Sequence, residues 1–336
     1  MKVNGVYVKD YMKLDVMQHE IPNEPGPNEV LVKTMACGVC CWDSWLYRGV
    51  NAPGPYPYVI GHKGAGIVEK VGSEVDNLKP GDKVFAAYGG NDMMSEYFIN
   101  RKDGVVKLSD EVKDWASVIY EPACCVINVV NSLDIQLGDH VVLVGAGYMG
   151  LQTLQVLTKG SQAGRITVFE LRDDRRRMAE AMNPTEVADP ESEEGKKLIE
   201  DIIKAGGADV VIDFGATTSG FELADSLTKQ AGKLGIATFH RGDVTFNGTK
   251  WHLGGLKVYN LSPFSNAHYP ELLPKAYEMI RKRVLAPEEY VTHTAYYKDL
   301  EAMENLFQRA CDKEDNYMKG VVLFTKQCKE RGQYEW

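Results

Sequence analysis

The sequence contains no long run of apolar residues. Residues 141–144 form one of its longest apolar runs, and such a run is far too short to cross a bilayer. The N-terminus also lacks a basic region followed by an apolar core, so no secretory signal is expected. We therefore expect a cytoplasmic protein with no membrane partner.

Positive charge is scarce and is not concentrated in any block. Lysine and arginine total 38 against 47 aspartate and glutamate residues, which gives a formal net charge of −9. A chain with this balance and no long basic segment is not expected to bind nucleic acid. A small neutral or weakly charged molecule is the expected ligand.

Cysteine is too unevenly spread for a disulfide framework. There are seven cysteines, and most fall in two clusters at residues 37–41 and 124–125. An odd number in two clusters of a long chain is typical of reduced thiols at a metal or active site. We expect no structural disulfide.

The remaining composition is that of a globular protein, with 44% hydrophobic and 25% charged residues, and its length allows two domains. Short β-like runs separated by Gly/Pro turns fill the first 120 residues, whereas strands alternate with helices from residue 139 to about 264. An amphipathic helix near 271–283 and an apolar strand at 320–324 follow, and we expect them to pack on the first domain. The predicted fold is α/β, with a doubly wound parallel-sheet domain at 123–264 and a mainly β domain at 1–122 and 265–336.

Residues 140–170 run strand, glycine turn, helix, strand, and predict a dinucleotide site. Gly145 permits the tight turn, Gly147 lets the backbone approach a pyrophosphate, and Gly150 allows the helix to pack closely on the strand. Glu170 ends the next strand, where a carboxylate binds ribose hydroxyls and repels a 2′-phosphate, so NAD(H) is favoured over NADP(H). Tyr148 and Met149, which complete the turn, are further candidate cofactor contacts. Several arginines follow Glu170 and weigh against this preference: Arg172, Arg175, Arg176 and Arg177.

Three separate segments, residues 36–43, 61–68 and 120–125, supply potential metal ligands. A thiolate, an imidazole and a carboxylate from these segments would leave a fourth position for water or substrate, which is the arrangement of catalytic zinc. The alternative is that Cys37 and Cys40 form an isolated thiol pair or redox couple.

These segments resemble the zinc-dependent medium-chain dehydrogenases. The Cys-Gly-Val-Cys element at 37–40, the Gly-His-x-x-x-Gly-x-Val-x-x-Val-Gly element at 61–72, Pro-Gly-Asp-x-Val at 80–84 and the glycine triad occur in the family's order. The resemblance implies a Rossmann domain that binds NAD(H), a GroES-like catalytic domain, and a homodimer or homotetramer. The last Rossmann strand, near 257–261, resembles the segment that extends the family's sheet across a dimer.

The same resemblance implies one catalytic zinc on Cys40, His62 and Glu121, the last as in the sugar-alcohol branch, where Glu-Pro replaces a cysteine. Asp43 matches the carboxylate that fixes the metal-bound histidine, and Lys319 matches a basic residue that supports this carboxylate. No cysteine lies between Cys41 and Cys124, so the structural zinc of some relatives is not expected. Cys125 falls where the family approaches the nicotinamide ring.

Two positions depart from the family pattern. The family usually has Gly-His-Glu, but this chain has Lys63, which would either point away from the metal or act as a neutral base. Trp42 stands where a serine or threonine usually relays the alcohol proton, and Trp45 replaces a histidine that often ends this relay. Together with Tyr47 and Tyr88 these aromatic residues suggest a cyclic or glycoside-like substrate, and an ordinary aromatic core is the alternative.

The leading hypothesis is an NAD-dependent, zinc-dependent dehydrogenase of a secondary alcohol, most plainly a polyol, cyclitol or sugar, with Lys63, Asp43 and Trp42 at the reacting centre. One alternative is an epimerase or lyase that retains NAD through transient oxidation, with Lys63 as the acid–base group. The other is a metal-free nucleotide-binding protein that is not an enzyme, in which Lys63 records the loss of catalysis.

Overall fold

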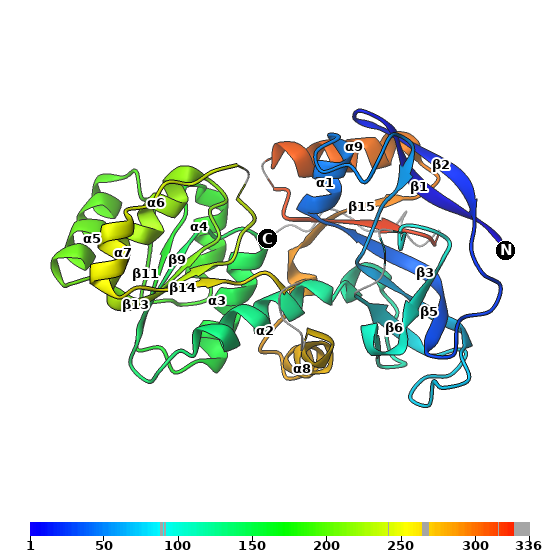
Figure 1. Cartoon of the computed structure of the whole chain (residues 1–336), viewed down its shortest axis with the longest axis horizontal. Helices are drawn as coiled ribbons and strands as arrows, with labels where there is room; N and C mark the ends of the chain where they lie inside the picture. Colours follow the sequence, from blue (N-terminus) through cyan, green and yellow to red (C-terminus); the bar gives the residue numbers. More distant parts are fainter. Residues whose placement is uncertain (88–89, 91, 241, 264–268, 315, 326–336) are drawn as a thin grey trace. The chain divides into compact units, whose positions relative to one another are not determined.

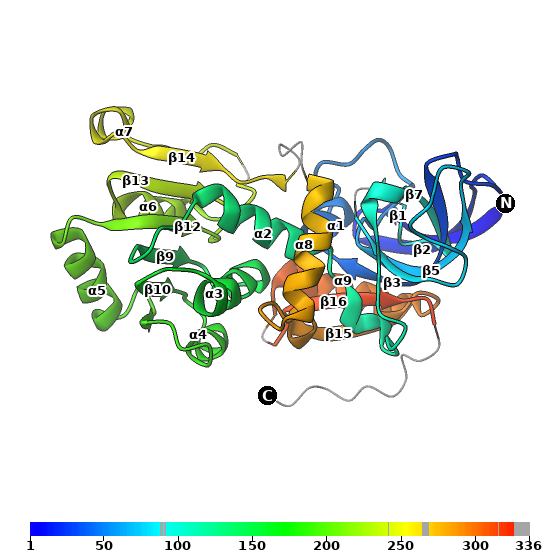
Figure 2. The same ribbon diagram turned by 90° about the horizontal axis from the view of Figure 1, so that it is seen from below.

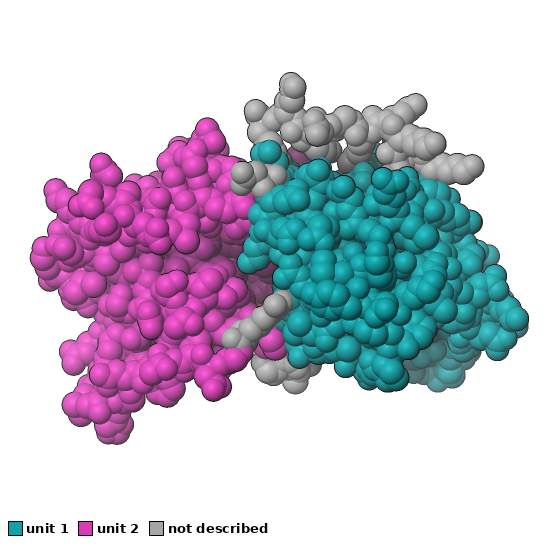
Figure 3. All heavy atoms as spheres, turned by 90° about the horizontal axis from the view of Figure 1, so that it is seen from above, with its two compact units in different colours: residues 1–121, 287–336 teal, residues 122–286 magenta. Residues whose placement is uncertain are grey.

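The structure is a computed structural model that describes residues 1–87, 90, 92–240, 242–263, 269–314 and 316–325. The chain divides into two compact units, which Figure 3 colours separately. Unit 1 comprises Met1–Glu121 and Pro287–Trp336, and unit 2 comprises Pro122–Ala286. The second division falls at 286/287, whereas the sequence placed it at 264/265. The predicted helix, α8 (Tyr269–Arg281), therefore groups with unit 2 and not with the mainly β domain.

Unit 1 is mainly β, as expected, and its largest sheet has the order β15-β16-β3-β5-β6-β8, with β7 also paired to β3. A smaller sheet has the order β2-β1-β4. The strands are β1 (Lys2–Asp10), β2 (Lys13–Glu20), β3 (Glu29–Val39), β4 (Tyr58–Val59), β5 (Gly64–Val71), β6 (Lys83–Ala86), β7 (Tyr97–Arg101), β8 (Val105–Lys107), β15 (Val291–Tyr296) and β16 (Lys319–Leu323).

Two helices of unit 1 pack against each other beside these strands (Figure 1). They are α1 (Cys41–Tyr47) and α9 (Leu300–Asp312), which lie far apart in the sequence. Short 3-10 helices lie at Lys102–Gly104, Trp115–Val118 and Pro287–Tyr290. The core between the sheets and α9 is built from alternating apolar strand residues such as Val30, Val32 and Val84, together with Leu306 and Phe307 of α9.

Unit 2 contains a six-stranded sheet in the order β11-β10-β9-β12-β13-β14, and every pair is parallel. Taken from β9, this is the 3-2-1-4-5-6 order of the Rossmann fold, which confirms the predicted doubly wound sheet. The strands are β9 (His140–Val144), β10 (Arg165–Phe169), β11 (Glu186–Ala188), β12 (Ala208–Asp213), β13 (Thr228–Ile236) and β14 (Lys257–Asn260).

Helices cover this sheet, with α6 above and α3 below it in Figure 1, and Figure 2 gives the view from below. The strands are nearly continuous apolar runs because helices cover them, and Val142, Val211 and Leu234 are fully buried. The helices are α2 (Glu121–Leu133), α3 (Tyr148–Gly160), α4 (Asp173–Glu180), α5 (Glu193–Lys204), α6 (Thr218–Leu227), α7 (Gly248–Gly254) and α8.

One helical stretch of the described residues, Trp115–Leu133, is long and apolar enough by composition to cross a membrane. Of its most apolar window, 72% is buried inside the fold, as is usual for a core helix, so it is weak evidence of a span.

Candidate functional site

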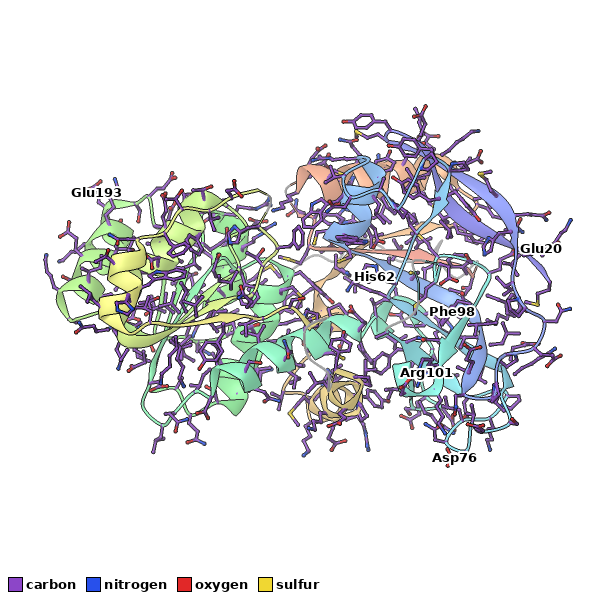
Figure 4. All side chains as sticks on the ribbon, in the orientation of Figure 1. Glu20, His62, Asp76, Phe98, Arg101 and Glu193 are labelled. Carbon is purple, nitrogen blue, oxygen red and sulfur yellow. The ribbon has the colours of Figure 1, made fainter. Side chains whose placement is uncertain are left out.

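The ends of three neighbouring strands bring the predicted metal-site residues together. β3 ends one residue before Cys40, β5 begins directly after His62 and Lys63, and β16 begins at Lys319. β3 pairs with β5 on one side and with β16 on the other, so segments far apart in sequence meet at one place in unit 1. Figure 4 labels His62 in this region.

Glycines let the histidine segment approach its neighbours closely. Gly61 has a φ of +99°, and a Cβ there would lie 2.6 Å from the Cβ of Met94. At Gly66, a Cβ would lie 2.1 Å from the carbonyl oxygen of Lys33 on β3. Strand packing therefore requires glycine at both positions of the Gly-His element. The close packing that these glycines allow determines where His62 lies.

Asp43 contacts the two residues expected to hold the metal. Its Oδ2 accepts a 2.7 Å hydrogen bond from the backbone N–H of Cys40, and its Oδ1 lies 3.5 Å from Nδ1 of His62. Burial acts to lower the pKa of His62, but the adjacent Asp43 carboxylate outweighs it and raises that pKa to about 10. Asp43 itself is fully buried, so it can orient the His62 ring and hold the backbone of Cys40, but it is closed to solvent.

Lys63 points into this cluster. The residue is 5% exposed, and its ammonium forms an ion pair and hydrogen bond with the carboxylate of Glu121, the first residue of α2. The sequence left open whether Lys63 points away, and the structure shows that it points inward. The residue expected as the third metal ligand is thus held by a cation.

The thiol of Cys40 has a second cysteine beside it. The Sγ atoms of Cys40 and Cys41 are 4.0 Å apart. The contact with Cys41 lowers the pKa of Cys40 well below its usual value; burial opposes this shift, and Lys63 and His62 reinforce it. By contrast, Cys37 is fully buried, and burial raises its pKa to about 12.

The aromatic residues of α1 divide between the surface and the core. Trp42 and Trp45 are half-buried, with their rings in an edge-to-face arrangement at 6.0 Å. Tyr47 is a core residue that is 2% exposed, and its hydroxyl donates to the carbonyl of Met12. Tyr47 therefore has an ordinary structural role, and Tyr88 lies outside the described residues.

Lys319 is a second buried cation in the cluster. Its ammonium donates a 2.7 Å hydrogen bond to the carbonyl of Val39, which is the last residue of β3. Burial lowers the pKa of Lys319, and Lys63 lowers it further, whereas Cys40, Glu121 and Asp43 act to raise it.

In unit 2, the glycine turn follows β9 directly. Gly145 has a φ of +100°, and a Cβ on Gly150 would lie 2.2 Å from the carbonyl oxygen of Gly145, so both glycines are required by the fold. Gly147 precedes α3, and a Cβ there would meet only Nη1 of Arg175, at an ordinary 3.7 Å. The packing around residue 147 therefore does not require a glycine. A glycine at such a position is expected where a ligand approaches the backbone closely.

Glu170 lies at this turn, just after β10. Its Oε2 accepts a 2.6 Å hydrogen bond from the backbone N–H of Ala146, and Oε1 accepts one of 3.0 Å from the N–H of Arg172. The carboxylate therefore lies at the end of the second Rossmann strand, as the sequence predicts. It also stabilises the glycine turn through the hydrogen bond from Ala146. Nearby, the Nε of Arg175 is buried without a hydrogen-bond partner among the described residues.

The remaining cofactor candidates lie on helices of unit 2. Tyr148 and Met149 form the first turn of α3, and both are half-buried. Cys125 lies on α2, where its Sγ is 4.0 Å from the hydroxyl of Tyr269 on α8.

Comparisons with known proteins agree with this geometry. Residues 26–110 match the family described as alcohol dehydrogenase GroES-like domain, and residues 147–278 match zinc-binding dehydrogenase. The chain is 25% identical to the starvation-sensing protein RspB of Escherichia coli K12, over 91% of this chain and 96% of that protein. The chain belongs to the zinc-dependent medium-chain dehydrogenase family. It is an oxidoreductase of the alcohol dehydrogenase type.

Two further relatives of this dehydrogenase illustrate the range of the family. The sorbitol dehydrogenase of Bacillus subtilis is 23% identical, over 94% of this chain and 98% of that protein. The structure of the alcohol dehydrogenase rspB from Escherichia coli CFT073, complexed with NADH, covers 96% of this chain and 99% of its own, with 22% identity and a TM-score of 0.79. At this identity the structural match establishes the shared fold.

The family's zinc does not fit the residues as they are arranged in this dehydrogenase. Cys40 and His62 are adjacent, but Glu121 is paired with Lys63, and no three cysteine, histidine or acidic side chains of the described ranges converge to hold a metal ion. Two like unit charges 4 Å apart repel by about 4 kcal/mol at an effective dielectric constant of 20, and a divalent ion doubles this cost. The ammonium and a zinc ion therefore compete for the same carboxylate.

Two features of the two regions were not predicted from the sequence. Cys41 contacts Cys40 in unit 1. In unit 2, Nε2 of His240 lies 2.6 Å from Oδ2 of the buried Asp213, at the carboxyl end of β12. Ligands of open α/β sheets bind at the carboxyl ends of the strands, so the end of β12 could have been predicted to lie near a ligand site. No sequence motif marks His240 itself.

Proposed function

We propose that the protein is an NAD(H)-dependent oxidoreductase that interconverts a secondary alcohol and a ketone, with a polyol, cyclitol or sugar as its substrate. The observation that carries this proposal is Glu170, whose carboxylate lies against the glycine turn of the Rossmann sheet. A carboxylate in this place favours the ribose hydroxyls of NAD(H) and disfavours a 2′-phosphate.

When bound, the cofactor supplies the hydride acceptor at its nicotinamide ring. In the direction of oxidation, the carbinol C–H bond breaks with its electron pair, and the hydroxyl proton leaves for water. Negative charge then grows on the substrate oxygen, and a preorganised positive charge stabilises it. Lys63 is the residue we assign to this task. Asp43 is a positioning residue, because it is fully buried and already accepts from Cys40.

A polyol or sugar is the proposed substrate class for two reasons. Glu121 followed by Pro122 resembles the sugar-alcohol branch of the family, and sorbitol dehydrogenase is among the relatives. Trp42 and Trp45 are half-buried on α1, which begins directly after Cys40, and aromatic faces pack well against the C–H surfaces of a sugar ring.

The test is to screen polyols, cyclitols and sugars for NADH formation, with NAD⁺ and NADP⁺ in parallel and Gly147→Val as the control that blocks the cofactor. We expect NADH formation with at least one secondary alcohol and none with the control. Product formation without net NADH would instead indicate the NAD-retaining epimerase or lyase. A folded protein that binds NADH but converts no member of the panel would contradict the proposal.

A further inference from the structure

The cluster around Cys40 contains equal numbers of buried carboxylates and buried ammonium groups. The carboxylates are those of Asp43 and Glu121, which are 0% and 8% exposed, and the ammonium groups are those of Lys63 and Lys319, which are 5% and 4% exposed. Buried charges are tolerated when they are paired. The charges of these four side chains cancel without any metal ion.

The charges of the cluster are balanced by Lys63, the residue at which this chain departs from the family pattern. A glutamate in place of Lys63 would leave three carboxylates facing a single ammonium group, and a divalent cation would then be needed. With Lys63 present, a zinc ion would add two positive charges beside two that are already buried. With glutamate at position 63 the buried charges balance only when a divalent cation is bound, whereas with Lys63 they balance without one.

Geometry leads to the same result. Lys63 holds an oxygen of Glu121. The remaining candidate ligands are Cys40, whose backbone N–H donates to Asp43, and His62, whose Nδ1 lies 3.5 Å from Oδ1 of Asp43. Two protein ligands are fewer than the three of a catalytic zinc site. A metal could recruit Glu121 only by displacing the Lys63 ammonium from its carboxylate.

We propose that the Lys63 ammonium takes the place of the divalent cation, so that the protein folds with a complete site and binds zinc only weakly. Lys63 neutralises Glu121, as the metal would. This inference goes beyond the proposed function, because it concerns metal affinity and holds whichever alcohol is the substrate.

The experiment compares zinc binding by the full-length wild type, Lys63→Met and Lys70→Met, all first dialysed against a chelator. Zinc is titrated in competition with a chromophoric chelator, and zinc per chain is counted after desalting. Lys70→Met is the matched control, because Lys70 pairs with Glu24 on the surface of the same unit. We expect Lys63→Met to bind one zinc about 100-fold more tightly than the wild type. The Lys70→Met variant should match the wild type.

Adding Glu121→Gln to Lys63→Met should abolish the gain, because the gain requires the released carboxylate. Wild-type affinity equal to that of Lys63→Met would overturn the proposal, and so would a folded Lys63→Met that binds no zinc. If Lys63→Met does not fold, Lys63→Gln replaces it, since its amide still donates to Glu121 without a charge. The zinc affinity of Lys63→Gln is then compared with that of the wild type and with that of Lys63→Gln combined with Glu121→Gln. None of these readouts is activity, so the proposed function is tested separately.

Discussion

The ammonium of Lys63 and the carboxylate of Glu121 form an ion pair in the interior of unit 1, across 58 positions of sequence. Removal of one partner of a buried pair leaves an uncompensated charge, which typically costs about 3 kcal/mol or more. We expect Lys63→Met and Glu121→Gln each to lower the free energy of unfolding in the presence of a chelator. The double variant should recover much of this loss, and urea denaturation measures all four proteins. Additive losses would show that the two groups are not coupled.

Gly147, directly before α3, and Gly150, in its first turn, should respond in opposite ways to a methyl group. At Gly147 the fold has room for a Cβ, so Gly147→Ala should keep its melting temperature and lose NADH affinity by about tenfold or more, because the pyrophosphate needs this space. At Gly150 a Cβ meets a backbone carbonyl at 2.2 Å, so Gly150→Ala should be destabilised. Thermal unfolding and fluorescence titration with NADH check both. Equal stability losses would contradict the assignment of Gly147 to the ligand.

Glu170 should determine the choice between NAD(H) and NADP(H). In Glu170→Ser the repulsion of a 2′-phosphate is removed, and the guanidinium of Arg175 remains at the turn. We expect the ratio of kcat/KM for NAD⁺ over NADP⁺ to fall by about 10- to 100-fold, equivalent to about 1.4–2.8 kcal/mol. The affinity for NAD⁺ should also fall, because the Ala146 hydrogen bond is lost. Arg175→Ala is the control, and added to Glu170→Ser it should remove any gain with NADP⁺.

Acid should weaken unit 1 through Glu96. Burial acts to raise the pKa of this carboxyl, but hydrogen bonds from the Tyr297 hydroxyl and from Asn4 lower it below its ordinary value of 4.5. The folded state therefore binds fewer protons, and this stabilisation is present above pH 4.5 and is lost as the pH falls through the lowered pKa. Glu96→Gln should be less stable than the wild type at pH 7, with the difference shrinking in acid. A constant difference between the two unfolding curves would refute this role.

The sequence predicted both folds and the position of the cofactor turn because these depend on local patterns. Apolar runs marked β9, β12 and β13. Gly145 is required by the positive φ of the turn, and Gly150 by its contact with the carbonyl of Gly145. The placement of α8 with unit 2 was not predicted, because an amphipathic helix shows that it has a partner but not which one.

The inner arrangement of the Cys40 cluster depends on contacts over long sequence separations, which one sequence does not show. Lys63 was recognisable as an unusual residue, but whether it points inward depends on Glu121, and that pairing is set by the ends of β5 and α2. Similarly, Tyr47 could be assigned to the core only after α9 was seen to pack on α1.

The edge strand β14 predicts a dimer or tetramer. It pairs with β13 on one side, and no described strand of the chain pairs with its other side, so its backbone groups are available to a second copy. Light scattering at micromolar concentration should give two or four times the 37.4 kDa of the chain. Alternate residues of a strand direct their N–H groups to opposite edges, so of Val258→Pro and Tyr259→Pro one should dissociate the oligomer and the other should disturb β13 pairing and lower stability. A monomer in the wild type, or an intact oligomer in both variants, would exclude this interface.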